Sequence, residues 1–269
     1  EDWPGKAHSA AELRKLWDAD RPAPPAFARC PLGGDPSRSQ RATGFFRTAQ
    51  VDGRWYLIDP HGHPFFSAGM DLVNLEQGSF ATRVTGRESL YQQLPPPGPA
   101  WLAPGRDVSF HLANVIERFG ANWRQQWAAS IVKRLQSWGF NTIANWSQWD
   151  VLQNSPMPFV VSAGIGGVRS VEGGAGYWAK MKDPYDPAFP AAADNAIKGL
   201  QTFNGNPLCI GYFVDNELAW EEVRLGVLNS PPDQPARQAF IRQLQSKYAT
   251  LEALNTAWAA TAESWDALR

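Results

Sequence analysis

Asp215, Asn216 and Glu217 directly follow an apolar run, and their side chains could do acid–base chemistry. A carboxylic acid walled by aromatic side chains such as Tyr212 and Trp220 would be partly desolvated. Because desolvation disfavours the charged form of a carboxyl group, we expect Glu217 to hold a proton near neutral pH and donate it to a leaving group. The amide of Asn216 is suited to a neutral hydrogen bond with a sugar hydroxyl.

The same three residues have a second interpretation, in which they only cap the next helix. Asp and Asn are favoured N-caps, and acidic side chains suit a helix N-terminus. The run before them, residues 210–214, is β-branched and aromatic, has no helical period and follows Asn206-Pro207. It predicts a short strand buried on both faces, as in a parallel sheet. The C-terminal ends of such strands carry the chemistry of βα-barrel enzymes.

Three earlier segments are also predicted strands: residues 65–73, 140–146 and 158–164. The helices predicted with them occupy residues 112–119, 123–138 and 189–203. This alternation is typical of a parallel sheet. Together with the resemblance described below, the polar and aromatic residues at the strand ends lead us to expect these substrate-binding residues: Asp71, Asn74, Asn145, Trp146, Trp149 and Trp220. A turn that ends the strand explains Asp71 and Asn74 about equally well.

The first 64 residues predict an N-terminal extension and a small β-rich module, and residues 65–269 a second domain. The extension contains a helix from Ser9 to Trp17, and the module contains hairpin turns at Asp52-Gly53 and at residues 60–62. Residues 75–108 show little periodicity and predict a long excursion without regular structure. After Glu217 we expect helices at 235–248 and 251–258 and no further strand. In the helix predicted at 123–138, the apolar stripe consists of Trp127, Ile131, Leu135 and Trp138.

The composition bounds the partners. There are 25 basic and 26 acidic residues, which disfavours nucleic acid as a partner. No apolar run approaches the roughly 20 residues that span a bilayer, so we expect no membrane segment. Cys30, Cys209 and the four His have no zinc-like spacing, so no metal or cofactor is expected and Cys209 is predicted to be a buried thiol. A first residue other than Met indicates a processed or trimmed product.

Four segments carry a resemblance to a known family: residues 55–66, 138–146, 211–217 and 248–258. In these residues and in their order the chain resembles the retaining glycoside hydrolases built on (β/α)8 barrels. It is most similar to the family 50 β-agarases, with the family 42 β-galactosidases as relatives. The resemblance implies Glu217 as the general acid/base, Asn216 as its sugar-binding neighbour, and hydrolysis of β-linked galactose units in a polysaccharide such as agarose. We also expect a secreted or periplasmic protein.

The chain departs from that family in one respect. A retaining glycosidase needs a second carboxylate about 5 Å from the first, as the nucleophile. In the family this glutamate ends a later strand, whereas Glu221 and Glu222 lie too close to Glu217 in sequence, and Glu252 and Glu263 lie in helical or loop sequence. We therefore expect the N-terminal half of a (β/α)8 TIM barrel, completed by a missing C-terminal segment or by self-association.

Two alternatives stay open. A non-catalytic carbohydrate-binding protein could keep a cleft lined by Trp146, Trp149 and Trp220 without turning substrate over. A β-glucan or β-mannan hydrolase of the same clan would carry the same Asn-Glu pair. Binding without product formation would indicate the first alternative, and a screen of polysaccharides would identify the second.

Overall fold

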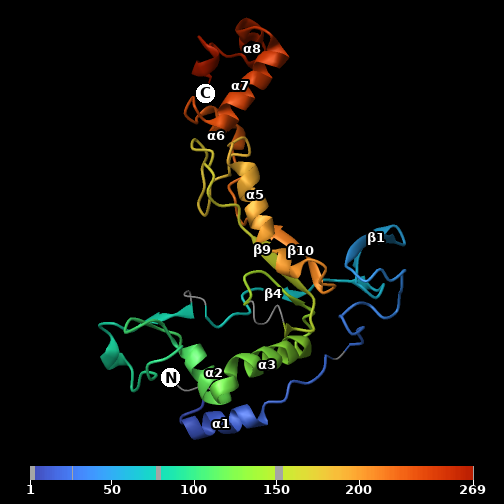
Figure 1. Ribbon diagram of the computed structural model, residues 1–269, viewed down its shortest axis with the longest axis vertical. Helices are drawn as coiled ribbons and strands as arrows, with labels where there is room; N and C mark the ends of the chain where they lie inside the picture. The colour runs from blue at the N-terminus through green and yellow to red at the C-terminus, as the bar shows by residue number, and fades with distance from the viewer. Residues whose placement is uncertain (1–3, 26, 77–79, 149–153, 269) are drawn as a thin grey trace. The chain divides into compact units, whose positions relative to one another are not determined.

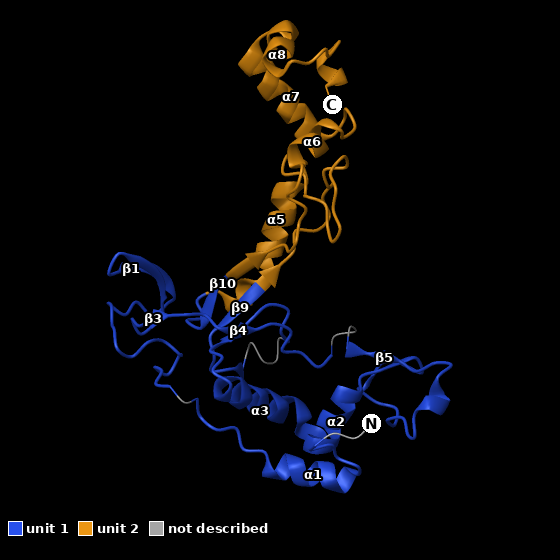
Figure 2. Cartoon of the chain, turned by 180° about the vertical axis from the view of Figure 1, so that it is seen from behind, with its two compact units in different colours: residues 1–161, 205–211 blue, residues 162–204, 212–269 orange. Residues whose placement is uncertain are grey.

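The computed structural model describes residues 4–25, 27–76, 80–148 and 154–268 (Figure 1). The chain forms two compact units (Figure 2). Unit 1 consists of Glu1–Val161 and Gly205–Gly211, and unit 2 of Ser162–Asn204 and Tyr212–Arg269. Strands β9 (Phe159–Ala163) and β10 (Cys209–Val214) each contribute residues to both units.

The fold is α/β with a parallel sheet. The sheet has the order β10-β9-β8-β4, in which β4 (Gly69–Met70) pairs in parallel with β8 (Thr142–Ile143) and β8 in parallel with β9. Ile143 and Phe159, which are paired in register, are fully buried. Helices α2 (Phe110–Phe119) and α3 (Trp123–Ser137) follow β4 along the chain, and α5 (Phe189–Lys198) follows β9. The predicted alternation of strands and helices is therefore confirmed.

Two of the predicted strands are shorter than expected. The segment 65–73 divides into β3 (Pro64–Phe65), which pairs antiparallel with β2 (Arg54–Ile58), and β4. The segment 140–146 keeps only the two residues of β8. Asn141 explains the early limit of β8, because its side chain takes the place of ladder hydrogen bonds. Its Nδ2 donates to the carbonyls of Phe66 (2.9 Å) and Gly33 (3.2 Å), and its Oδ1 accepts from the Ala68 N–H (2.8 Å).

An antiparallel sheet precedes β4 in the chain. It contains β1 (Arg47–Val51), β2 and β3. Val51 pairs with Arg54, so Asp52 and Gly53 form a two-residue turn with φ values of 50° and 75°. Positive φ at both positions is the type I′ geometry that suits an Asp-Gly hairpin, and this hairpin prediction is confirmed.

The prediction of a structureless excursion over residues 75–108 is wrong. This segment contains the 3₁₀ helix η2 (Glu88–Leu90) and an antiparallel sheet of β5 (Thr82–Arg83), β6 (Trp101–Ala103) and β7 (Asp107–Val108). Strands of two or three residues are too short to leave an alternating pattern in the sequence.

Capping residues account for the helix boundaries in unit 1. Helix α1 (Ala10–Ala19) begins after Ser9, whose Oγ accepts the N–H of Glu12, as predicted. The 3₁₀ helix η3 (Gly120–Asn122) joins α2 to α3. Gly139 follows the C-cap of α3 with φ of 89°. The predicted stripe of α3 is partly wrong, because Trp138 is 58% exposed and the buried side chains are those of Trp123, Trp127, Val132 and Leu135.

Unit 2 is mainly helical after β10. It contains α5, η4 (Gln201–Phe203), α6 (Val223–Leu228), α7 (Pro235–Tyr248), α8 (Leu251–Trp258) and η5 (Trp265–Ala267). The predictions of α7 and α8 are confirmed, whereas α6 was not predicted. A cluster of buried side chains packs these last elements together: Leu228, Ile241, Leu244, Leu254 and Leu268. The nearly buried Arg237 donates to the carbonyls of Ser230, Asp266 and Leu268, which fixes the C-terminal segment to α7. Over the described residues, no helix is long and apolar enough to cross a membrane.

We expect Asn141→Asp to lower the free energy of unfolding by about 2–4 kcal/mol, since two buried carbonyls lose their donor and face a carboxylate instead. Urea unfolding followed by circular dichroism measures this change. The control is Asn204→Asp, at an exposed position, which should stay within about 0.5 kcal/mol of the parent protein. Equal stability of the two variants would show that the Asn141 hydrogen bonds do not hold the strand ends.

Candidate functional site

The turn at the end of β10 is fixed by the side chain of Asp215. Its backbone N–H donates to the carbonyl of Ala163 (2.8 Å), and its Oδ1 accepts the N–H of Ile165 (2.9 Å). Asp215 and Glu217 have φ values of 56° and 49°. The left-handed region is uncommon for residues other than glycine, and such residues cluster at functional sites. The turn therefore has a defined geometry that presents the Glu217 carboxylate at the surface.

The helix-capping interpretation of these residues is wrong. The next helix, α6, begins at Val223 and has Glu222 as its N-cap. Between the turn and that helix, Leu218 forms a parallel bridge with Ala179, and the Ala219 N–H donates to the Ala179 carbonyl (3.0 Å). Asn216 and Glu217 are thus separated from α6 and remain exposed.

The expected burial of the residues around Glu217 is also wrong. Residues 210–214 were predicted to be buried on both faces, but the second half of β10 is exposed, including Tyr212, Phe213 and Val214. Trp220 is 74% exposed. β10 pairs with β9 on one side, and no strand of the described residues pairs with its other side. The aromatic side chains are present, but nothing in the described part of the chain closes them over Glu217.

A second group of predicted residues lies together in unit 1. The Oδ1 of Asp71 accepts the N–H of Asn145 (2.9 Å), and the Leu72 N–H donates to the Asn145 carbonyl (2.9 Å). The Nδ2 of Asn74 donates to the carbonyl of Trp146 (3.4 Å). The ends of β4 and β8 therefore bring Asp71, Asn74, Asn145 and Trp146 together.

The accessible surface of this group differs from residue to residue. Asn145 is buried, whereas Asp71 and Trp146 are exposed. Trp146 has φ of 57°, another left-handed residue at a strand end. Asn216, Glu217 and Trp220 lie in unit 2. Trp149 lies outside the described residues.

Glu76 is a carboxylate beside the Asp71 group that the sequence analysis did not select. It pairs with Arg124, and its Oε2 accepts from Gln148, whose Oε1 accepts the Leu75 N–H (3.0 Å). The only signal in the sequence is its position just after Asn74, and its partners come from distant segments. These contacts fix the segment that follows Asn74, whose Oδ1 accepts the Glu76 N–H (2.8 Å).

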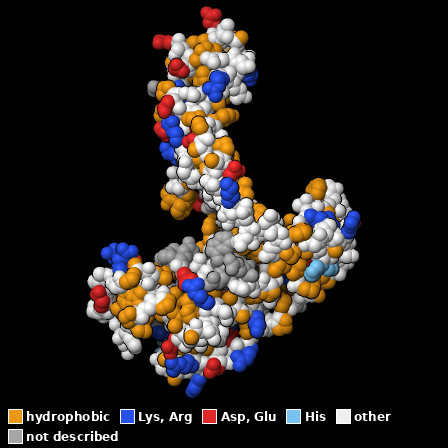
Figure 3. Space-filling view, viewed as in Figure 1, with side chains coloured by type: hydrophobic (Ala, Val, Ile, Leu, Met, Phe, Trp, Pro, Cys, Tyr) orange, Lys and Arg blue, Asp and Glu red, His pale blue; other side chains and the backbone are white. Residues whose placement is uncertain are grey.

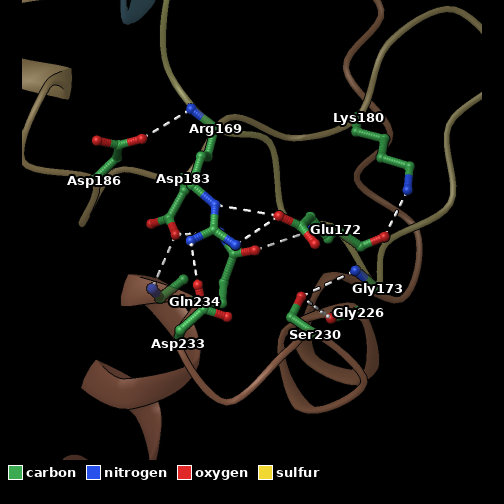
Figure 4. Close-up of polar contacts among 11 residues, drawn as sticks. Arg169, Glu172, Gly173, Lys180, Asp183, Asp186, Gly226, Ser230, Asp233 and Gln234 are labelled. Carbon is green, nitrogen blue, oxygen red and sulfur yellow. Dashed lines mark hydrogen bonds and ion pairs between the residues drawn. The ribbon is translucent and has the colours of Figure 1, made fainter.

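Buried carboxylates position the loop that precedes α5 (Figure 4). Asp183 is fully buried, and its Oδ2 accepts from the Gln234 side chain and from the Ala236 N–H (3.0 Å), so it caps α7 from a distant part of the chain. Its Oδ1 accepts the Tyr185 N–H (2.8 Å). Asp186 accepts the N–H groups of Ala188 and Arg169 (both 2.8 Å). These bonds fix the backbone around Tyr185.

The part of the chain that the structure describes contains no candidate metal site. Within it, no group of three or more His, Cys, Asp or Glu side chains could hold a metal ion. Cys30 and Cys209 are free cysteines. Cys209 is half-buried, whereas we expected a buried thiol.

Comparisons with curated proteins give two relatives from Vibrio sp. (strain JT0107). β-Agarase A is 31% identical over 310 aligned positions, which cover 98% of this chain and 31% of that protein. β-Agarase B is 29% identical over 273 positions, which cover 84% of this chain and 28% of that protein. The chain thus spans less than a third of the length of either relative. No known family profile matches the chain.

Solved structures agree with these relatives. The agarase AgWH50C superposes with a TM-score of 0.84 at 28% identity, covering 99% of this chain and 45% of that structure. An exo-β-agarase gives a TM-score of 0.84 at 25% identity, with the same coverage of both chains. BpGH50, at 16% identity and a TM-score of 0.53, shares the fold. The fold and the sequence therefore point to the same group of proteins.

The polar contacts of Asp186 predict a pH dependence of stability. The backbone N–H groups of Ala188 and Arg169, followed by the charge of Arg169, hold the pKa of Asp186 below its ordinary value. A carboxyl group whose pKa is lowered by folding stabilises the fold above its unfolded-state pKa, and this stabilisation is lost as the pH falls through the folded-state pKa. Asp186→Asn should therefore be less stable than the parent protein at pH 7, and the difference should shrink below about pH 4.

Urea unfolding of both proteins at pH 7, 5 and 3 tests this expectation. Asp194→Asn, at an exposed position of α5, is the matched control and should change stability little at any of these pH values. A difference between Asp186→Asn and the parent protein that is as large at pH 3 as at pH 7 would contradict the expectation.

Proposed function

We propose that this chain, a β-agarase-like protein of the glycoside hydrolase family 50 type, is part of a retaining glycosidase that cleaves β-linked galactose units in a polysaccharide such as agarose. The observation that carries the proposal is the turn after β10, in which a strained backbone holds Glu217 out at the C-terminal end of a strand that joins the parallel sheet beside β9. Catalytic residues of barrel enzymes lie at this end of the strands. The similarity to β-agarases over 98% of the chain supports the same reading.

In this proposal Glu217 is the general acid/base. It protonates the glycosidic oxygen as the bond to the leaving sugar breaks, and then removes a proton from the water that releases the second product. Asn216 donates a hydrogen bond to a hydroxyl of the sugar at the cleavage point. Asp215 is a positioning residue, because its carboxylate is engaged by the Ile165 N–H and so fixes the turn.

The sheet supports a partial barrel. Four strands in the order β10-β9-β8-β4, with parallel pairing between β4, β8 and β9, match the N-terminal half of a (β/α)8 TIM barrel. We place a β-rich module in residues 1–64 and the barrel segment in 65–269. The second carboxylate of a retaining mechanism, about 5 Å from the first, then belongs to a segment that completes the barrel. A secreted or periplasmic location accords with a polymeric substrate.

The remaining site residues are proposed to bind substrate. Trp146 and Trp220 expose ring faces, and the apolar face of a sugar stacks on such rings. Asp71, Asn74 and Asn145 define the strand ends in unit 1, where they orient Trp146. Trp149 is proposed for the same role from its place in the sequence.

The exposure of Glu217 favours one second candidate, a carbohydrate-binding protein without turnover. An exposed carboxylate can accept hydrogen bonds from sugar hydroxyl groups, and binding of this kind needs no proton transfer. Turnover separates the two candidates, and the range of polysaccharides that are cleaved separates agarose from β-glucan or β-mannan.

We expect Glu217→Gln, in the longest available form of the protein, to lower kcat on agarose oligosaccharides by about 10³-fold, since general acid/base groups typically contribute 10²–10⁴-fold. Reducing-end release measures the rate. Glu221→Gln is the control, because Glu221 is also exposed and close in sequence. If the parent protein binds these sugars without cleaving them, the binding candidate replaces the hydrolase. Full activity of Glu217→Gln would remove Glu217 from the acid/base role.

The free side of β10 predicts association of the 269-residue chain. An unpaired strand edge with exposed Tyr212, Phe213 and Val214 is a template for pairing with another chain (Figure 3 shows hydrophobic side chains at the surface). We expect light scattering to give a mass above that of a monomer, and Val214→Lys to lower it. Leu90→Lys, at a position 76% exposed but distant in sequence, should leave the mass unchanged. A stable monomer of the parent chain with a cooperative melt would contradict the half-barrel proposal.

A further inference from the structure

Unit 2 contains a cavity of about 380 Å³ that the sequence analysis did not predict. Residues 181–189, 220–227 and helix α7 surround it, and its walls include Tyr185, Phe189, Trp220 and Phe240. Trp220 and Tyr185 are 74% and 61% exposed although they line a cavity. Two accessible aromatic faces at an open cavity are suited to stacking on a sugar ring.

The charged side chains that line the cavity are all basic. Lys182 and Arg224 line it, and no Asp or Glu is among the described residues that do so. No hydrogen bond or ion pair in the described part of the chain joins either side chain to an acidic group. Two other cations of unit 2 are engaged: Arg169 pairs with Glu172 and Asp233, and Lys180 donates to the Glu172 carbonyl (Figure 4). The cavity therefore combines aromatic walls with two cations that are available to an anion.

The walls are held in place from outside the cavity. Asp183 binds the N–H groups of Tyr185 and Ala236, so one buried carboxylate fixes both the loop with Tyr185 and the first turn of α7. The Ala219 N–H bonded to the Ala179 carbonyl fixes the backbone next to Trp220. Because the backbone on both sides is fixed, the cavity is a preformed site, which lowers the entropic cost of binding.

We propose that this cavity binds a galactose-type ring that carries an anionic substituent. Trp220 and Tyr185 contact the apolar face of the ring, and Arg224 and Lys182 bind the sulfate or carboxylate group. Planar guanidinium groups match the oxygen geometry of such anions. The inference rests on the proposed function and narrows its substrate, since Trp220 follows Glu217 closely in sequence and the sugars bound there are charged units of the polysaccharide.

Titrations followed by the backbone amide NMR signals of the 269-residue chain test the proposal with four probes: galactose, galactose 6-sulfate, galacturonate and inorganic sulfate. We expect an anionic sugar to bind at least about tenfold more tightly than galactose, the effect of one charge-assisted contact. It should also bind more tightly than inorganic sulfate. Comparison of galactose 6-sulfate with galacturonate identifies the anion. Equal binding of galactose and both anionic sugars, or equal binding of inorganic sulfate and the sugar sulfate, would overturn the proposal.

Matched variants assign the site. Arg224→Gln should remove the preference for the anionic sugar, and Trp220→Ala should weaken every sugar and leave inorganic sulfate unaffected. Arg242→Gln and Trp178→Ala are the controls, because Arg242 is an exposed cation of α7 outside the cavity and Trp178 is 71% exposed. Equal effects of a variant and its control would also overturn the proposal.

Glu217→Gln separates the two proposals. It should keep the preference for the anionic sugar, since binding in the cavity needs no proton transfer. Loss of turnover in Glu217→Gln together with equal binding of neutral and anionic sugars would leave the hydrolase proposal standing and reject this one. Absence of turnover in the parent protein together with a clear preference for the anionic sugar would reject the hydrolase proposal and leave the anionic-sugar site standing.

Discussion

In each unit, a backbone N–H in the loop after one strand donates to an aspartate that directly follows the neighbouring strand, and this hydrogen bond fixes the site residues there. Asp71 is the first residue after β4 and accepts the N–H of Asn145, which lies just beyond β8. Asp215 is the first residue after β10 and accepts the N–H of Ile165, which lies just beyond β9. The same contact thus occurs once in each unit. In both, the aspartate side chain lies directly after its strand and connects that strand end to the loop after the adjacent strand.

The consequence of this contact is a strained backbone next to it. Leu72, Trp146, Asp215 and Glu217 all have φ values between 49° and 57°. Single residues in this region cost of order 1–3 kcal/mol and persist only where the surrounding bonds impose them. The aspartate bonds supply that constraint at both strand ends. Two accessible side chains, that of Trp146 in unit 1 and that of Glu217 in unit 2, sit on these left-handed residues and are therefore presented in fixed directions.

Local signals in the sequence were enough to predict several elements. Pro235 at the first position of α7 and the side chain of Thr250 at the N-cap of α8 set boundaries that match the predicted ones. Asp52-Gly53 fixed the hairpin in the same way. Elements that depend on distant partners were not predictable. β8 is short because Asn141 bonds to Phe66 and Ala68, and the cavity in unit 2 depends on Asp183 reaching Ala236.

The same distinction between local signals and distant partners applies to the candidate site. The order of residue types at the end of β10 was sufficient to select Glu217, but its exposure depends on what pairs with the free side of the strand. An acid/base group has to lose water on at least one side before it holds a proton at neutral pH. The exposed rings of Tyr212, Phe213 and Trp220 are the apolar material for that step, and they need a covering segment or a bound sugar to exclude water around Glu217. Where a covering segment supplies this step, completion of the sheet and activation of the acid are one physical event in the proposed enzyme, because the same segment buries the strand edge and desolvates the carboxyl group.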